Sequence, residues 1–107
     1  MTEQMENRVN GFLGLCMRAG RIISGQEACV DLVRREEAAL VLLDGGASEN
    51  TRKRILDACH SHSVPVWARG EGALGQAIGK SGRMVIALKM DGMAQNLLSM
   101  LGGEQRL

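Results

Sequence analysis

The sequence predicts a three-layer α/β/α sandwich with a central mixed, mostly parallel four-stranded sheet. Two observations lead to this prediction. Segments whose apolar residues follow helical spacing alternate with short apolar runs that are typical of buried strands. The length of 107 residues suits one domain with one core, so we expect residues 1–107 to form a single layered unit.

The first predicted elements are a helix over residues 6–19 and a strand over residues 22–23. The apolar residues of the helix recur at helical spacing, and Gly20 stands where such a helix would end. The letters S-G-Q-E then match a capping box, with Ser24 as N-cap and Glu27 reaching back from the third helical position. A second helix is therefore expected to begin at this point.

The central elements are a strand and a helix joined by a polar turn. Residues 40–43 are a continuous aliphatic run, as expected of a strand covered on both faces. Ser48 is a favourable N-cap for a third helix. The apolar stripe of that helix includes Ile55 and Cys59. This arrangement predicts a strand followed by an amphipathic helix.

The last elements repeat the alternation. Residues 64–68 read as a strand, with Pro65 near its start, where a missing amide is tolerated. Residues 74–78 indicate a short helix and residues 84–88 a final strand. Asp91 then opens a C-terminal helix. These elements complete the sandwich.

The composition limits the classes of partner. Thirteen Lys and Arg against twelve Asp and Glu leave a formal net charge of +1, so only a local arrangement of groups could attract nucleic acid. Aromatic residues make up 2%, which excludes a stacking platform for bases. The N-terminus lacks the pattern of a signal peptide, and no apolar run is long enough to span a bilayer. We expect a cytoplasmic protein without a membrane partner.

Side chains with catalytic or metal-binding chemistry are sparse. The three cysteines have no C-x-x-C spacing, which indicates reduced, buried thiols instead of a zinc site. Asp44 follows the aliphatic run, but a carboxylate beside a helix N-terminus is more often a cap or dipole partner than an acid or base. We expect no catalysis, no cofactor and no metal.

Glycine-rich letters near the end of the chain imitate two phosphate-binding motifs. Gly79, Lys80 and Ser81 resemble the end of a P-loop, yet the required earlier glycine falls on Leu74, and a strand follows instead of a helix. The same region has the G-x-x-G spacing of a KH clamp, but that clamp joins two helices. Neither motif is favoured.

The segment L-L-D-G-G-A-S-E-N-T-R-K-R-I-L over residues 42–56 has two interpretations. A helix N-terminus with free amides, a hydroxyl cap at Ser48 and three nearby cations could hold an RNA phosphate. Alternatively, Ser48 is only a cap and Arg52, Lys53 and Arg54 are solvated, since they fan over roughly 200° of helix surface. The residues themselves leave both interpretations open.

The motifs L-G-L-x-x-R-A-G, S-G, A-S-x-N-T-x-K and L-G-x-A-I-G-K follow one another over about residues 7–101. In this order and spacing the chain resembles the small bacterial YlxQ-type proteins of the kink-turn-binding ribosomal-protein superfamily. The resemblance implies an α/β/α sandwich that binds a sharply kinked RNA internal loop with tandem G·A pairs and catalyses nothing.

In that superfamily the RNA is held by the loop after the first strand and the start of the second helix, assisted by the loops after the next two strands. Gly25 matches the glycine of the superfamily's Gly-x-Lys/Asn-Glu/Gln-x-x-Lys pattern. Glu27, Ala28 and Asp31 replace its three polar positions. By this resemblance and the placement of charge, the expected RNA-binding residues are Arg18, Arg21, Ser24, Gly25, Gln26, Glu27, Ala28, Asp31, Ser48, Asn50, Thr51, Lys53, Arg69, Leu74 and Gly75.

The expected function is that of a non-catalytic, monomeric protein that binds structured RNA of the kink-turn type and associates with ribosomal RNA. The retained Arg18, Arg21, Lys53 and Arg69 favour this reading. The alternative is a protein-interaction module on the same fold whose RNA-binding edge has decayed, which the replaced polar positions favour.

Overall fold

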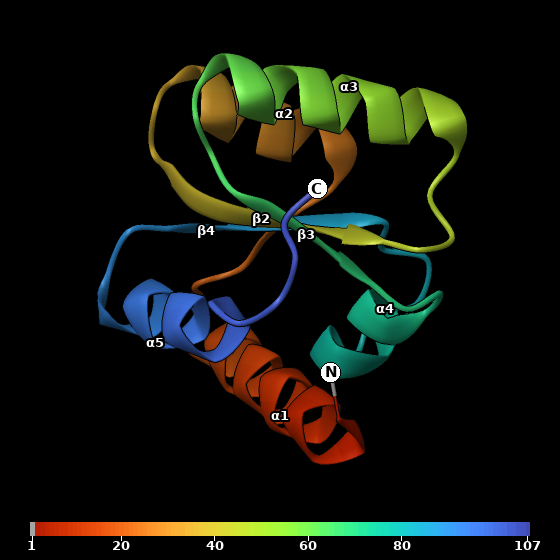
Figure 1. Cartoon of the computed structure of the whole chain (residues 1–107), viewed down its shortest axis with the longest axis vertical. Helices are drawn as coiled ribbons and strands as arrows, with labels where there is room; N and C mark the ends of the chain where they lie inside the picture. Colours follow the sequence, from red (N-terminus) through yellow and green to blue (C-terminus); the bar gives the residue numbers. More distant parts are fainter. Residues whose placement is uncertain (1) are drawn as a thin grey trace.

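A computed structural model describes residues 2–107 and arranges them in three layers (Figure 1). Its elements are α1 (Glu3–Arg18), β1 (Ile23–Ser24), α2 (Gln26–Arg34), β2 (Ala38–Asp44), α3 (Glu49–Ser61), β3 (Val66–Arg69), α4 (Ala73–Ile78), β4 (Val85–Lys89) and α5 (Gly92–Leu101). The alternation of helix and strand therefore agrees with the prediction. Within the described range, no helix combines the length and hydropathy needed to cross a bilayer.

The sheet is mixed and has the strand order β1-β4-β2-β3. β2 pairs in parallel with β3, whereas β4 pairs antiparallel with both β2 and β1. The predicted fold class and four-stranded mixed sheet are confirmed. The expectation that the sheet is mostly parallel was wrong, because β4 returns between β1 and β2 in the opposite direction.

Both faces of the sheet are covered by helices, so β2 is buried along almost its whole length. Leu40 and Leu42 belong to a core cluster that includes residues of α1, α4 and α5. Val41 and Leu43 point to the opposite face, into a cluster with residues of α2 and α3. This period of two explains why a strand with two covered faces appears as an uninterrupted aliphatic run.

Two of the predicted helix caps are present. The Ser48 hydroxyl accepts a hydrogen bond from the Thr51 N–H at 3.1 Å, and the Asp91 carboxylate accepts one from the Ala94 N–H at 2.8 Å. Each cap uses a side chain three residues from the amide that it satisfies, and such local pairs can be read from sequence.

The predicted capping box at the start of α2 was wrong. Ser24 belongs to β1 and is paired with Ile86, and the N-cap of α2 is Gly25, which has no capping side chain. Gly25 has a φ of 102°, a conformation that disfavours any residue with a Cβ. Glu27 makes its hydrogen bonds to Arg54 of α3 instead of reaching back along α2.

The C-terminal segment after α5 lies along β3 at the edge of the sheet. The Leu107 N–H donates to the Val66 carbonyl at 2.9 Å, and Trp67 Nε1 donates to the Glu104 carbonyl at 3.3 Å. The guanidinium of Arg106 lies 5.3 Å from the centre of the Trp67 ring, within the range of a cation–π contact. These contacts hold the segment against the outer side of β3.

Candidate functional site

One edge of the sheet brings together four connecting segments. β1, β2 and β3 all end at this edge and β4 begins there, since β2 and β3 are parallel and β4 is antiparallel to both β1 and β2. We call this surface the loop edge; it consists of residues 24–26, 45–48, 70–72 and 79–84. It also contains the N-termini of α2, α3 and α4, so free backbone amides gather on one side of the molecule.

Asp44, the last residue of β2, accepts hydrogen bonds from backbone groups in and beside the loop edge. Its side chain is buried, and Oδ2 accepts hydrogen bonds from the N–H groups of Gly46 at 2.9 Å and Gly72 at 3.0 Å. Oδ1 accepts a third, at 3.2 Å, from the N–H of Leu74 in α4. The carboxylate thus joins the loops after β2 and β3. This is a structural role, as the sequence interpretation favoured.

A chain of side-chain hydrogen bonds joins the first turns of α3 and α2. The Ser48 hydroxyl donates to Thr51 Oγ1 at 3.1 Å, and Thr51 Oγ1 donates to Gln26 Oε1 at 2.7 Å. The amide of Gln26 donates in turn to Glu27 Oε2 at 3.1 Å. The chain therefore brings together four residues that the resemblance assigns to RNA binding: Ser48, Thr51, Gln26 and Glu27. Glu27 is also hydrogen-bonded to Arg54, which lies 27 positions further along the sequence.

The carboxylate of Glu27 is matched by a cation from the neighbouring helix. Arg54 donates from Nε to Oε2 at 2.9 Å and from Nη2 to Oε1 at 2.7 Å. This pair lowers the pKa of Glu27 and raises that of Arg54. Glu27 occupies a position where the resemblance implies Lys or Asn, and its negative charge is here opposed by a guanidinium.

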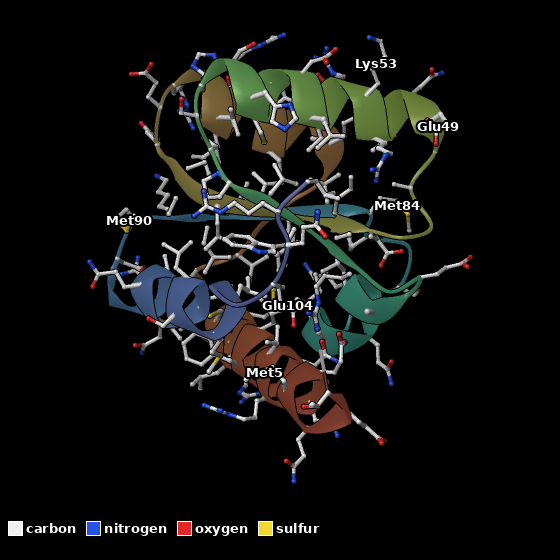
Figure 2. The ribbon with its side chains drawn as sticks, viewed as in Figure 1. Met5, Glu49, Lys53, Met84, Met90 and Glu104 are labelled. Atoms are coloured by element: carbon white, nitrogen blue, oxygen red, sulfur yellow. The ribbon has the colours of Figure 1, made fainter. Side chains whose placement is uncertain are left out.

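The remaining candidates on α2 and α3 are exposed. Asn50 and Lys53 are exposed on α3, and Lys53 points away from the sheet (Figure 2). Lys53 Nζ lies 3.4 Å from Asp57, one helical turn further on. Ala28 and Asp31 are exposed on α2, and Asp31 pairs with Arg35 at 3.4 Å. A ligand at the loop edge could reach these side chains without a rearrangement of the core.

Arg69 is not a surface cation. Its side chain is only 1% exposed, and Nη2 donates to Glu6 at 2.9 Å and to Asn10 at 3.2 Å. These contacts fasten the end of β3 to α1. The sequence placed Arg69 correctly at the end of a strand but could not reveal that α1 supplies a carboxylate partner, the partly exposed Glu6.

Arg21 lies at the opposite edge of the sheet from the expected RNA surface. It precedes β1, and its guanidinium pairs at 3.0 Å with Asp91, which caps α5. Arg18 is exposed in the last turn of α1, three residues earlier. Arg21, one of the expected RNA-binding residues, therefore does not lie at the loop edge, because β1 is traversed between Arg21 and Gly25.

Leu74 and Gly75 are buried residues of α4 that pack behind the loop edge. Leu74 is fully buried in the core, so its side chain cannot contact a ligand. A Cβ on Gly75 would lie 2.8 Å from the Lys80 carbonyl oxygen and 3.0 Å from the Ser81 Cα. Only glycine allows α4 to approach the 79–84 loop this closely.

Two further cations, which the sequence interpretation missed, lie in the 79–84 loop. Lys80 is exposed and Arg83 half-buried, and the loop leads into the start of β4 at the loop edge. Within residues 2–107 neither side chain makes a hydrogen bond or ion pair, and the same holds for Arg52. The only sequence signal was the G-K-S-G run, which resembles a phosphate-binding motif too weakly to be favoured.

No group of three His, Cys, Asp or Glu side chains that could hold a metal occurs among the described residues. Cys59 is buried, His60 Nε2 lies 3.2 Å from the Leu107 carbonyl, and His62 Nδ1 lies 3.6 Å from Glu36. These neighbours in sequence therefore point to different parts of the molecule.

The fold and its loop edge define a class of small α/β/α sandwich in which helix N-termini and cations gather at one end of a mixed sheet. The chain belongs to the ribosomal protein L7Ae/L30e/S12e/Gadd45 family, whose model matches residues 7–98. Membership of this family confirms the resemblance seen in the motifs.

Two relatives are similar over most of the chain. An RNA-binding protein YlxQ of Bacillus subtilis (strain 168) is 39% identical over 91 residues, which cover 84% of this chain and 91% of the relative. An RNA-binding protein YlxQ of Enterococcus faecium is 33% identical over 104 residues, covering 96% of this chain and all of the relative.

Solved structures have the same fold. A protein with unknown function from Bacillus halodurans C superposes with a TM-score of 0.81 at 35% identity, covering 89% of this chain and 97% of that one. The Giardia lamblia 15.5kD RNA binding protein superposes with a TM-score of 0.75, covering 95% and 88% of the two chains. Its identity of 21% makes this second likeness one of fold alone.

Proposed function

We propose that this chain is a non-catalytic RNA-binding protein that acts as a single domain and holds structured RNA, of the kink-turn type, at the loop edge. The observation that carries the proposal is the hydrogen-bonded chain from Ser48 through Thr51 to Gln26, which joins the first turns of α2 and α3. This chain fixes two helix N-termini side by side, where their free amides can bind phosphate oxygens.

The cations around this chain supply the electrostatic part of the proposed contact. Arg52, Lys80 and Arg83 have no carboxylate partner among the described residues, so they can bind phosphates without first breaking an ion pair. The two relatives named as RNA-binding proteins support the assignment. Ribosomal RNA is the proposed source of the structured target, since the family is one of ribosomal proteins.

A protein-interaction module with a decayed RNA edge is the competing function. It was favoured by the acids at Glu27 and Asp31, which would repel phosphate if they were bare. Both carboxylates have arginine partners, Arg54 and Arg35 respectively. We therefore favour the RNA-binding function over the protein-interaction function. Selective binding of kinked RNA is the property that distinguishes the two.

The first test of the proposal is crosslinking of the protein to RNA in cells, followed by sequencing of the bound RNA. Titration of a recovered RNA at several salt concentrations should give a log–log slope of about −3.6 to −4.5 if four or five cations contact phosphates of a duplex-like site. Absence of binding to any structured RNA would refute RNA binding, and a slope near zero would refute the phosphate contacts.

Kink-turn recognition is tested by restoring the superfamily pattern with the combined changes Glu27→Lys, Ala28→Gln and Asp31→Lys. The added positive charge should strengthen binding to every RNA, so the informative quantity is selectivity. The variant should prefer a hairpin with a kinked G·A-containing loop over a plain duplex of equal length by more than the native protein does. Equal strengthening for both RNAs would mean that these positions do not read the kinked loop.

A further inference from the structure

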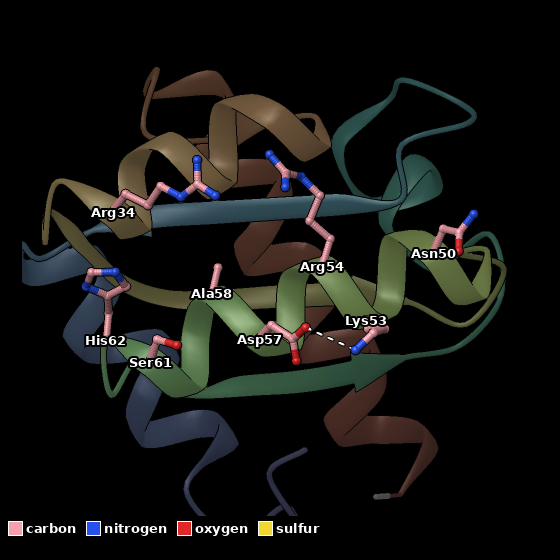
Figure 3. Close-up of a pocket in the computed structure, with 8 residues that line it drawn as sticks. All are labelled: Arg34, Asn50, Lys53, Arg54, Asp57, Ala58, Ser61 and His62. Atoms are coloured by element: carbon pink, nitrogen blue, oxygen red, sulfur yellow. Dashed lines mark hydrogen bonds and ion pairs between the residues drawn. The ribbon is translucent and has the colours of Figure 1, made fainter.

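A groove runs along the outer surface between α2 and α3, on the helix layer that covers one face of the sheet. Its volume is about 450 Å³, and Figure 3 shows Arg34 extending into it from α2 and Arg54 from α3. Asn50 and Ser61, both on α3, line its two ends. Of its lining residues only Ala58 is apolar, so the groove suits a polar ligand.

The groove carries positive charge that is not fully paired. Arg34, Lys53 and Arg54 are opposed in the lining by a single carboxylate, Asp57, whereas the whole chain has a formal net charge of only +1. Lys53 is paired with Asp57, and Arg54 is paired with Glu27 at the rim.

Arg34 differs from the other two cations. Its side chain is exposed, and within residues 2–107 it makes no hydrogen bond or ion pair. The pKa of Glu27 is lowered chiefly by its hydrogen bond from Arg54, and the charge of Arg34, two turns further along α2, adds a smaller effect in the same direction. Arg34 is therefore the cation that a ligand phosphate can bind at the least cost.

The groove is continuous with the loop edge. Asn50 lies in the first turn of α3, next to Thr51, whose hydroxyl binds Gln26 at the start of α2. From Asn50 to Ser61 the helix rises roughly 16 Å. A strand of RNA that leaves the loop edge can thus enter the groove directly.

We propose that this groove is a second, sequence-independent contact for the RNA backbone. A strand leaving the loop edge lies along it, Arg34 binds a phosphate, and Asn50 and Ser61 donate hydrogen bonds to the sugar–phosphate chain. The lining has no Phe, Tyr or Trp, and its single imidazole, His62, lies 3.6 Å from Glu36, so the backbone is the part of the RNA that the groove would recognise. The inference rests on the proposed function, because the loop edge must first hold the RNA.

The test compares RNAs that differ only in length beyond the loop-edge site. The first probe is a hairpin with a kinked, G·A-containing internal loop. Two further probes add a single-stranded tail of about ten uridines to its 5′ or its 3′ end, within the usual site size of single-strand grooves. The native protein should bind one of the tailed hairpins more tightly than the untailed hairpin.

The variant is Arg34→Gln, and Arg8→Gln is its matched control. Arg8 is an exposed arginine of α1, on the other side of the sheet, and likewise makes no hydrogen bond or ion pair within the described range. Arg34→Gln should weaken binding of the preferred tailed hairpin roughly 3- to 10-fold and lower its salt slope by about 0.7, the value for one lost single-strand contact. Both variants should bind the untailed hairpin within about twofold of each other.

The outcomes separate this inference from the function on which it rests. If no tail strengthens binding, or if Arg34→Gln and Arg8→Gln weaken the tailed complex equally, the groove does not bind RNA, although the loop edge still does. If the native protein binds neither the hairpin nor any RNA recovered from cells, the proposed function fails and the groove contact fails with it. Melting temperatures should match across the variants, because both arginines are exposed.

Discussion

The carboxylate of Glu27 and the guanidinium of Arg54 form a two-bonded pair, with Nε to Oε2 at 2.9 Å and Nη2 to Oε1 at 2.7 Å. The pair joins the first turn of α2 to the middle of α3 at the border between the loop edge and the α2–α3 groove. It links the two helices at the surface, and it also occupies a guanidinium that could otherwise bind phosphate.

Glu27→Gln should therefore strengthen RNA binding. The change removes the competing negative charge and frees Arg54 for a phosphate, which should raise affinity roughly 3- to 10-fold at low salt. Glu37→Gln is the control, because Glu37 carries the same charge and pairs with cations at the opposite edge of the sheet. Equal gains in the two variants, measured by titration with one RNA, would show that net charge alone is responsible.

The cations and the cap of α3 should respond differently to truncation. Arg52→Ala and Lys53→Ala should each weaken RNA binding while leaving the melting temperature nearly unchanged, since neither side chain is buried. Ser48→Ala should cost about 1 kcal/mol in the free energy of unfolding, because the Thr51 N–H loses its acceptor. Urea denaturation would contradict this distinction if all three variants were destabilised alike.

Asp44→Asn should destabilise the protein by about 2 to 3 kcal/mol. An amide cannot accept all three backbone hydrogen bonds, and its NH₂ group would face a buried N–H donor. Hydrogen exchange should speed up at the amides of Gly72 and Leu74. Asp57→Asn, which changes an exposed carboxylate of α3, is the control and should have little effect on stability. Unchanged exchange at both amides would mean that Asp44 does not hold the two loops together.

Two glycine substitutions should have opposite effects. Gly75→Ala places a Cβ 2.8 Å from the Lys80 carbonyl oxygen, so the backbone must move, at a cost of about 1 to 3 kcal/mol. The resulting shift of the 79–84 loop should also weaken RNA binding. Gly11→Ala lies inside α1, with nothing within 4 Å of the added Cβ, and should stabilise the protein by about 0.5 to 1 kcal/mol. Thermal unfolding of both variants measures the contrast, and a stable Gly75→Ala variant would contradict the close packing.

The buried thiols predict a loss of stability at alkaline pH. Burial raises the pKa of Cys29 to about 12 and that of Cys59 to about 11, above the value of about 8.5 for an unfolded thiol. The unfolded chain therefore releases protons that the folded chain keeps, and stability is complete below about pH 8.5 and falls as the pH rises. Between pH 8 and pH 10 the two thiols together should lower the free energy of unfolding by roughly 3 to 4 kcal/mol.

The matched variant for the thiols combines Cys29→Ala with Cys59→Ala. It should be less stable at pH 8, because both side chains are fully buried, but its stability should depend less steeply on pH. Urea denaturation at several pH values gives both quantities. The same slope in the native protein and the variant would assign the alkaline instability to other groups.

Local patterns in the sequence predicted most of the fold. The aliphatic run of β2, the cap at Ser48 and the cap at Asp91 depend on neighbouring residues, and all three are present. The direction of β4 could not be predicted in this way, because strand order is decided by packing across the whole chain. The same limit explains why a mostly parallel sheet was expected.

The errors in the candidate site have the same origin. Ser24 and Glu27 have the spacing of a capping box, but Ile86 pairs with one and Arg54 binds the other. Arg69 was expected at the surface, yet it is neutralised by Glu6, 63 positions earlier in the chain. A side chain with a charged partner distant in sequence looks free when only its neighbours are considered.

The C-terminal segment that lies along β3 limits how this protein can assemble with others. An uncovered edge strand would offer its backbone as a template for another chain, either in strand-addition complexes or in aggregates. At one side of the sheet, the Val66 carbonyl already accepts a hydrogen bond from the Leu107 N–H. At the other side, the edge strand β1 is only two residues long. Neither edge offers a long row of vacant hydrogen-bonding groups, so partners must dock on side chains and helix ends.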